Sequence, residues 1–430
     1  MRLVALIFIV ARLLCGPAAA AAPTPEKVLA NWYRMVLELA RHTPTYSPPV
    51  ASRSFAYLGV TAYEATASGN PDMQSLAGQL TDLSPLPPRD GTLDEALVLH
   101  AALSEAVTAF FGNTGPTGQR AMKALDRQMN ESLGDALDPD LAARSEAYGR
   151  AVADHVIAWS KGDGKSVVEN LGFPYEYTLG TEPWSWVPTS AIPLQQVPLM
   201  PGWREMRPFA MPSGAACPLP PPPEYSEDPA SAFYAEAMEV KTVRDNLTDE
   251  QKQIARFWSD DPMLSPTPPG HWMAIVLQIM ARDGLDTARS TDALARLGVA
   301  VADSFIACWD TKFQYDLLRP VTYIRRVIDP KFEPLLITPP FPEYPSGHST
   351  QSGAAATVLT AVFGEGFAFT DSTHVDDGLP ARNYPDFWAA ANEAALSRLY
   401  GGIHFRAAIA QGLAQGRCVG AYAEALRTLR

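Results

Sequence analysis

Apolar residues recur at three- and four-residue intervals along most of the chain, which is the period of an amphipathic helix. In the first half this pattern predicts helices over residues 26–40, 53–67, 94–111, 117–133 and 141–159. In the second half it predicts helices over residues 228–243, 249–258, 271–283, 291–312 and 349–359. The chain is therefore expected to be an all-α protein built from helical bundles.

The stretch from residue 161 to residue 227 breaks this pattern. It is rich in Pro, Gly and Trp and contains the tract Pro-Leu-Pro-Pro-Pro-Pro at 218–223. Because proline lacks an N–H donor and fixes its own φ, we expect no regular helix here and predict extended chain that wraps the surface. The stretch either simply joins two helical halves or also covers a functional pocket.

The first 22 residues resemble an export signal. Arg2 precedes an apolar run over residues 3–11, and small residues at 18–22 offer cleavage sites. The run is shorter than the about 20 residues that a membrane-spanning helix needs. We expect a signal peptide at 1–22 and an exported protein, either periplasmic or secreted.

Composition narrows the class of protein further. The chain has 430 residues, 47% of them hydrophobic, which is ample for a large core, and its formal charge of -13 argues against nucleic acid as a partner. No later segment is apolar enough to predict a membrane span. Beyond the signal, Cys217, Cys308 and Cys418 lack metal-ligand spacing; we expect at most one disulfide, with Cys308 buried and free.

Against this acidic background, three short segments of the second half carry cations and imidazoles. In the first, Lys312 and Arg319 are seven residues apart, so that on one helix they would project from nearly the same face, and Pro320 places Arg319 near the helix end. In the second, Ser346 is expected to cap a helix, and Gly347 lets the backbone come close to a ligand.

The third segment runs from Ser397 and Arg398 to His404. On an unbroken helix Arg398 and His404 would point in different directions, but Gly401 and Gly402 break the helix between them. Taken alone, each segment is more typical of a solvated helix face or a turn than of a binding site. Together with His348 they supply three fixed cations, two imidazoles, a hydroxyl and a helix N-terminus, which predicts a site for a tetrahedral oxyanion.

These residues resemble a known signature. The pattern Lys-x6-Arg-Pro, Pro-Ser-Gly-His and Ser-Arg-x5-His is similar to that of the type 2 phosphatidic acid phosphatase superfamily, which includes bacterial acid phosphatases and vanadium-dependent haloperoxidases. The resemblance to the bacterial haloperoxidase branch extends to residues 47–53, 62–65, 201–209, 247–251 and 268–272. It therefore covers most of the chain after the signal.

The resemblance implies a role for each residue of the signature. Vanadate or phosphate oxygens would be bound by five residues, namely Lys312, Arg319, Ser346, Gly347 and Arg398. His404 would be the ligand to vanadium in a peroxidase or the phosphoenzyme nucleophile in a phosphatase, and His348 would be the acid–base group. In a peroxidase, vanadate would act as a Lewis acid toward hydrogen peroxide while Lys312 polarises the peroxide.

Two further comparisons with the family concern the chemistry. Trp309 and Phe341 match positions that line the halide site in the fungal chloroperoxidase type, although both are equally typical of core aromatics. Many members have an aspartate four residues after the ligand histidine, where this chain has Ala408. A backbone carbonyl or a carboxylate from elsewhere must then orient His404, since a histidine ligand normally has such a partner.

We therefore expect the chain to have three parts after the signal peptide. An N-terminal helical scaffold covers 23–160, and the irregular connection covers 161–227. A catalytic domain with a four-helix-bundle core covers 228–430. The predicted activity is vanadate-dependent oxidation of halide by hydrogen peroxide. One alternative is a phosphatase with a phosphohistidine intermediate and no vanadate cofactor. A non-catalytic oxyanion-binding protein is a second alternative, although binding alone would not need two histidines.

Several polar residues are predicted to lie outside the site. Arg53 and Glu64 are expected to form exposed salt bridges, and His374 to lie exposed in a polar loop. His271 is expected to cap a helix or pack in the core, with a role in the pocket as the alternative. Asp260 is expected to be a solvated turn residue, with orientation of Arg398 or a histidine as the alternative.

Overall fold

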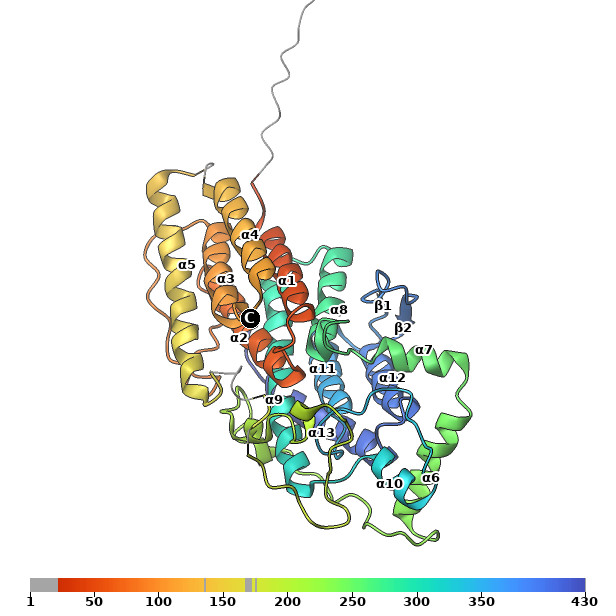
Figure 1. Cartoon of the computed structure of the whole chain (residues 1–430). Helices are drawn as coiled ribbons and strands as arrows, with labels where there is room; N and C mark the ends of the chain where they lie inside the picture. Colours follow the sequence, from red (N-terminus) through yellow and green to blue (C-terminus); the bar gives the residue numbers. More distant parts are fainter. Residues whose placement is uncertain (1–21, 135–136, 167–171, 175, 430) are drawn as a thin grey trace, which may run out of the picture.

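The computed structural model describes residues 22–134, 137–166, 172–174 and 176–429 (Figure 1). Over these ranges the chain is mostly helical, and a two-stranded antiparallel sheet joins β1 (Phe369–Asp371) to β2 (Arg382–Tyr384). The all-α prediction is therefore confirmed. None of the helices in this described part is long and apolar enough to cross a membrane. Residues 1–21 of the predicted export signal lie outside the described residues.

The predicted N-terminal helices all form, with ends that differ by five residues or fewer. They stand side by side in one half of the molecule (Figure 1) and are α1 (Pro25–Arg41), α2 (Pro48–Ala67), α3 (Glu95–Phe111), α4 (Pro116–Gly134) and α5 (Pro139–Ser160). Every residue of α2 from Pro49 to Ala65 is buried. A helix that is buried all round must lie inside the fold, and α2 does so by packing against α9.

The second half supplies the remaining helices. They are α6 (Ala232–Asp245), α7 (Asp249–Phe257), α8 (Thr267–Asp283), α9 (Thr287–Tyr315), α10 (Pro320–Val327), α11 (Gly347–Phe363), α12 (Phe387–Tyr400) and α13 (Arg406–Glu424). The long α9 contacts α2, α11 and α13, so one hydrophobic core runs from the N-terminal helices into the second half. The predicted domain boundaries at 160 and 227 stay predictions.

Helices α11 and α13 approach each other backbone to backbone. A Cβ atom on Gly416 would lie 2.1 Å from the carbonyl oxygen of Thr350, and one on Gly412 would lie 2.7 Å from the Cβ of Ser349. Gly353 of α11 is equally close to the Leu413 carbonyl of α13, at 2.7 Å. Because glycine hydrogens face the partner helix at these positions, the spacing of the two helices is set by main-chain atoms and the Cβ of Ser349.

The Pro- and Trp-rich connection contains no α-helix within its described residues, as expected, and forms only short 3-10 turns: η1 (Lys161–Asp163), η3 (Pro193–Gln195), η4 (Pro201–Glu205) and η5 (Gly214–Ala216). The prediction that it only wraps the surface is wrong, because Trp186, Trp203 and Phe209 are each 1% exposed. Asp303 of α9 anchors it by accepting hydrogen bonds from the backbone N–H groups of residues 209, 210 and 211, at 2.7, 2.8 and 2.9 Å.

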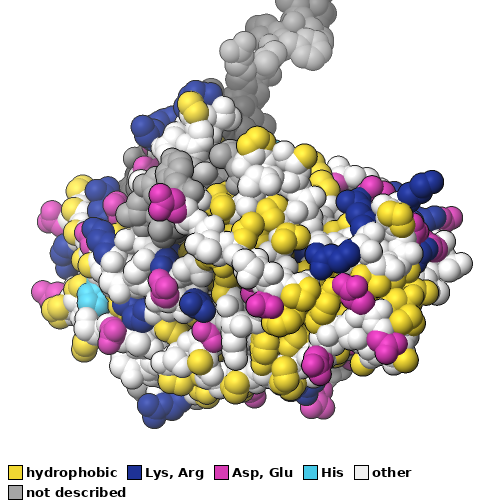
Figure 2. All heavy atoms as spheres, turned by 60° about the horizontal axis from the view of Figure 1, so that its bottom comes forward, with side chains coloured by type: hydrophobic (Ala, Val, Ile, Leu, Met, Phe, Trp, Pro, Cys, Tyr) yellow, Lys and Arg dark blue, Asp and Glu magenta, His cyan; other side chains and the backbone are white. Residues whose placement is uncertain are grey.

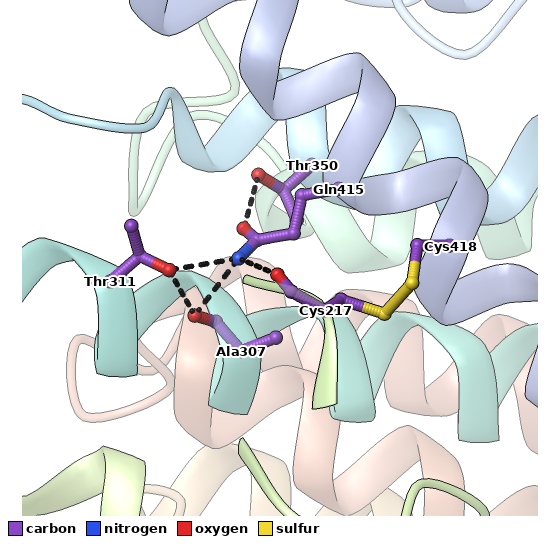
Figure 3. Close-up of a disulfide and its surroundings, with 6 residues drawn as sticks. All are labelled: Cys217, Ala307, Thr311, Thr350, Gln415 and Cys418. Atoms are coloured by element: carbon purple, nitrogen blue, oxygen red, sulfur yellow. Dashed lines mark hydrogen bonds between the residues drawn. A yellow bond between two sulfur atoms is a disulfide. The ribbon is translucent and has the colours of Figure 1, made fainter. Parts of the chain in front are cut away.

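A disulfide between Cys217 and Cys418 ties the same connection to α13 (Figure 3). Beside it, the Gln415 side-chain amide donates hydrogen bonds to the Cys217 carbonyl at 3.2 Å and to Thr311 Oγ1 at 2.9 Å. Cys308 is buried and has no disulfide partner within the described chain. The expectation of at most one disulfide, with Cys308 free, is confirmed.

Arg53 and Glu64 are not exposed, so that prediction is wrong. Arg53 is 4% exposed and pairs with buried Asp163 at 2.6 Å, while Glu64 is fully buried and accepts hydrogen bonds from Ser75 and from the Leu76 amide. Since α2 is enclosed on all sides, its charged side chains must find partners inside the protein.

The surface itself fits an acidic protein. On the face shown in Figure 2, basic side chains are interspersed with acidic ones, and apolar side chains gather between them. The three cations predicted for the anion site contribute nothing to this surface, because Lys312 and Arg319 are fully buried and Arg398 is 2% exposed.

Candidate active site

The first segment is placed differently from the prediction. Helix α9 ends at Tyr315 because Asp316 adopts a left-handed conformation with φ of 46°, and Arg319 stands at the N-cap of the following helix α10. Lys312 and Arg319 are therefore not two turns apart on one helix. They still meet, because the chain reverses between them and both cations lie over the ring of Phe341, at 5.2 and 5.0 Å from its centroid.

Lys312 is held by main-chain oxygens. Its ammonium donates to the carbonyls of Pro342, Glu343 and Pro345, the first two at 2.7 and 3.0 Å. Burial lowers the pKa of Lys312 to about 7. All three donors are therefore engaged, and contact with an oxyanion requires the release of one of these bonds.

The second segment begins helix α11, as predicted. Ser346 is its N-cap, and its Oγ accepts from the Ser349 N–H at 3.3 Å. Gly347 and His348 follow in the first turn and are half-buried, whereas Ser346 is fully buried. The N-terminus of α11, with its outward amides and positive dipole end, is thus the part of the site nearest to solvent.

The helix of the third segment is interrupted at Gly401 and Gly402, as predicted. Helix α12 ends at Tyr400, Gly402 takes a φ of +75°, and α13 begins at Arg406. A Cβ at Gly402 would lie 3.2 Å from Pro334 Cα, so the turn has no room for a larger residue. Arg398 and His404 are both buried and, with the helix interrupted, both can face the cluster around Arg319.

The tautomer of His404 follows from its two neighbours. Arg319 Nη1 lies 3.0 Å from His404 Nε2, and a guanidinium can only donate, so Nε2 carries the lone pair. The ring proton is then on Nδ1, which donates to Glu343 Oε1 at 2.8 Å. The lone pair of Nε2 therefore lies among the cations, as a ligand or a nucleophile requires.

Glu343 is the carboxylate that orients His404, since Ala408 has no side chain that could do so. Its Oε1 also accepts from the Phe405 N–H at 2.8 Å, and it is fully buried. Sequence reasoning expected a carboxylate or carbonyl from elsewhere but missed this residue. The available signal was its place two residues before the Pro-Ser-Gly-His segment. Ala408 instead contributes its carbonyl, which accepts from the Ser346 N–H at 3.0 Å.

Both imidazoles of the site are neutral. Burial, followed by Arg319 and Lys312, holds the pKa of His404 well below its ordinary value of 6.5. Burial and Arg398 do the same to the pKa of His348. His348 is thus uncharged, and the negative charge of a bound oxyanion would raise its pKa and so favour its protonation.

The two predicted halide-site aromatics lie together beside the cations. The ring centroids of Trp309 and Phe341 are 5.0 Å apart, and Trp309 Nε1 donates to the Leu199 carbonyl of the Pro-rich connection at 3.3 Å. Trp309 is fully buried, whereas Phe341 is half-buried. The connection therefore supports one wall of the site, and the halide role of both rings stays a prediction.

The residues present fit a tetrahedral oxyanion. Two buried polar atoms, Arg319 Nη2 and His348 Nε2, have no hydrogen-bond partner among the residues that the structure describes. Buried polar atoms are rarely left unpaired in a folded protein, so such atoms indicate a missing ligand. With the α11 N-terminus and the Nε2 lone pair of His404, they could hold a vanadate or phosphate group.

Comparison with known proteins agrees with this geometry. A family model described as the VCPO second helical-bundle domain matches residues 292–429, which contain every predicted site residue. The solved structure of a bacterial vanadium-dependent iodoperoxidase is 39% identical, with a TM-score of 0.86, and the match covers 95% of this chain and 99% of that one. A bacterial vanadium-dependent chloroperoxidase, 17% identical over 89% of this chain and 92% of that one, shares the fold with a TM-score of 0.70.

A shorter match is to the vanadium-dependent bromoperoxidase of Ascophyllum nodosum, which is 37% identical over 94 residues, or 19% of this chain and 17% of that protein. The chain thus matches about a sixth of the length of that relative. The nearly full-length similarity to the iodoperoxidase is the decisive comparison. It shows that this chain belongs to the vanadium-dependent haloperoxidases.

Proposed function

We propose that the halide oxidised by this haloperoxidase, with hydrogen peroxide as oxidant, is iodide. The relative that is similar over nearly its whole length is an iodoperoxidase, and its preference is carried to this chain only as a proposal. Iodide is also the most weakly hydrated and most easily oxidised of the common halides. A wall formed by the half-buried ring of Phe341 next to Trp309 suits a large anion that loses its water readily.

The observation that carries the proposed site is the orientation of His404. Arg319 on one side and Glu343 on the other fix the ring so that its Nε2 lone pair lies among buried cations. That arrangement suits a neutral imidazole ligand to vanadate, with Arg319, Arg398 and the α11 N-terminus around the oxygens.

Each residue then has a physical task. Bound vanadate supplies Lewis-acid activation of hydrogen peroxide. Arg319 and Arg398 compensate the negative charge of the oxyanion, and Lys312, whose pKa of about 7 lets it gain or lose a proton near neutrality, can donate a hydrogen bond to a bound oxygen. His348, neutral and half-buried at the mouth, accepts and returns protons.

A paired assay on metal-stripped protein tests this function. Oxidation of iodide, bromide and chloride by hydrogen peroxide is measured with and without added orthovanadate, beside turnover of an aryl phosphate. We expect iodide oxidation that depends on vanadate and is suppressed by phosphate. Aryl phosphate turnover that vanadate inhibits, without halide oxidation, would contradict the proposal.

Substitution of the ligand histidine tests the site itself. His404→Ala should abolish vanadate-dependent iodide oxidation, because the other imidazole, His348, stands on α11 and is not oriented by Arg319 and Glu343. Its far-ultraviolet circular dichroism should match that of the unchanged protein. Substantial remaining activity in a folded variant would refute the assignment.

We also propose that the protein is exported, in a periplasmic or secreted form. Arg2, the apolar run over residues 3–11 and the small residues at 18–22 support export. A disulfide between Cys217 and Cys418 is typical of an oxidising compartment. Mass spectrometry of protein recovered from the periplasm and the medium would test it. Cleavage near residue 22 is expected, and an intact N-terminus on cytoplasmic protein would contradict export.

A further inference from the structure

A second cluster of ionisable groups lies next to the anion site. Six side chains of alternating charge form one continuous series: Asp371, His271, Asp260, His374, Asp377 and Arg41. The successive distances are 2.8, 2.9, 3.2, 2.9 and 2.7 Å. The series begins at a fully buried carboxylate and ends at a side chain that is 20% exposed. We call it the His–Asp series.

The burial of this series corrects the predictions for its members. His374 is 4% exposed and Asp260 is 3% exposed, so neither is a solvated loop residue, while His271 is fully buried as a core residue would be. Burial alone would lower the pKa of His271, but Asp260 and Asp371 outweigh it and raise that pKa to about 10. His271 is therefore an imidazolium that bridges two carboxylates.

The series is better described as a charge network than as a metal centre. Asp260, His271 and His374 do place one ligand-type atom each within 4.8 Å of one another. However, all four ring nitrogens of the two histidines already lie within hydrogen-bond distance of a carboxylate oxygen. A metal ion would have to displace protons from both rings, and the charges already balance without it.

The segment that carries Asp260 contacts two groups of the anion site. The carbonyl of Trp258 accepts from Arg398 Nη2 at 2.6 Å, and the backbone of Ser259 forms a hydrogen bond with His348. Asp260 itself has a φ of +50°, a conformation that is unfavourable for a residue with a Cβ. Two consecutive peptide groups thus position Arg398 and His348, and a strained residue follows them.

The histidines hold this segment in place from the other side. His271 stacks on the indole of Trp258, with ring centroids 4.4 Å apart and an interplanar angle of 17°. Both His271 and His374 bond the carboxylate of Asp260, which offsets the strain at that residue. The Trp258 side chain also donates to Glu393 of α12, the helix that carries Arg398, at 3.0 Å.

We propose that His271 and His374 are positioning residues of the active site, which act through Asp260 and the 258–260 segment to fix Arg398 and His348 for oxyanion binding. The proposal goes beyond the proposed function, on which it rests only for the choice of oxyanion. Neither histidine touches the oxyanion. The His–Asp series joins four segments of the chain: Arg41 lies on α1, Asp260 in the 258–260 segment, His271 on α8, and His374 and Asp377 in the loop after β1, which ends at Asp371.

The test measures the dissociation constant of orthovanadate by calorimetry on the metal-stripped full chain. His271→Gln removes the charge and one of the two hydrogen bonds, and should weaken vanadate binding about tenfold or more, as loss of an outer partner does at other ligand sites. His100→Gln is the matched control. His100 is also fully buried and stacked on a tryptophan, Trp32, but lies in the N-terminal scaffold.

The control should lower thermal stability without changing vanadate affinity, because His100 is remote from the site. Equal vanadate affinities in both variants and the unchanged protein would overturn the proposal. If His271→Gln does not fold, the milder Asp377→Asn, at a residue whose side chain is 28% exposed, tests the same series with the same expected direction. His404→Ala decides the proposed function independently.

A double-mutant cycle separates positioning from general destabilisation. Combined with Arg398→Lys, His271→Gln should cause little further loss of vanadate affinity, since both changes disrupt the same contact. The guanidinium of Arg319 is held by the Phe341 and Ile403 carbonyls and not by the 258–260 segment. Combined with Arg319→Lys, His271→Gln should therefore cause its full loss of vanadate affinity. Additivity in both pairs, or a stoichiometric divalent metal in the purified protein, would refute the inference.

Discussion

Glu343 offers the sharpest single test of how His404, the proposed vanadate ligand, is oriented. Its Oε1 accepts from His404 Nδ1 and from the Phe405 N–H, both at 2.8 Å. Glu343→Ala removes the one oxygen that accepts both bonds and leaves two buried N–H donors unpaired. Each such donor costs about 1–3 kcal/mol, so the ring is expected to turn or the backbone at Phe405 to shift.

Glu343→Gln is the matched comparison. Its amide oxygen can keep both hydrogen bonds, and its nitrogen can take the place of Oε2, which has no hydrogen-bond partner among the described residues. Burial raises the pKa of Glu343 to about 8, so this side chain tolerates a neutral form. Because both substitutions remove the carboxylate charge, the difference between them isolates the hydrogen bonds.

We expect vanadate to bind Glu343→Ala about 10–100-fold more weakly than Glu343→Gln, or by about 1.4–2.7 kcal/mol. Titration calorimetry of the metal-stripped variants measures this, and circular dichroism checks that both are folded. Equal affinities in two folded variants would refute the reasoning, since His404 would then be oriented without Glu343.

Three further predictions concern stability. Cys217→Ser with Cys418→Ser opens a disulfide that joins residues 201 apart in sequence, which should cost about 2–5 kcal/mol and lower the Tm by about 2–6 °C in scanning calorimetry; an unchanged Tm would contradict it. Asp303→Ala leaves three backbone N–H groups without their acceptor and should cost about 3 kcal/mol, measured by urea denaturation, with Asp303→Asn as the milder control. Because the folded pKa of His271 is raised from 6.5 to about 10, its contribution to stability is full below about pH 6.5 and is lost as the pH rises toward 10. The Tm of the unchanged protein should therefore fall more steeply over this range than that of His271→Gln, and parallel curves would disprove the coupling.

The helices and the site segments could be predicted from sequence because both depend on local pattern. Apolar period places the helices, and the Gly401–Gly402 break follows from the conformational freedom of glycine. The wrong placement of Arg319 has a local cause. Asp316 ends α9 in a left-handed conformation that aspartate can adopt but that its sequence context does not require.

Other features depend on contacts between distant segments. Glu343 bonds a residue 61 positions away, and His374 is buried because its loop lies against the segment of Asp260, 114 positions away. The loop of His374 and the turn of Asp260 are both polar, so each taken separately predicts exposed side chains. Only their pairing, which satisfies the charges of both, makes burial favourable.

The close contact between α11 and α13 determines where this active site can change. His348 stands on α11 and His404 lies two residues before α13, and the two helices meet through Gly412, Gly416 and Gly353. No rotamer change can widen or narrow that gap, so the backbone of α11, which carries His348, keeps a fixed distance from α13. Adaptation to another halide or a bulkier organic acceptor is then left to the opposite wall, formed by Trp309, Phe341 and the Pro-rich connection.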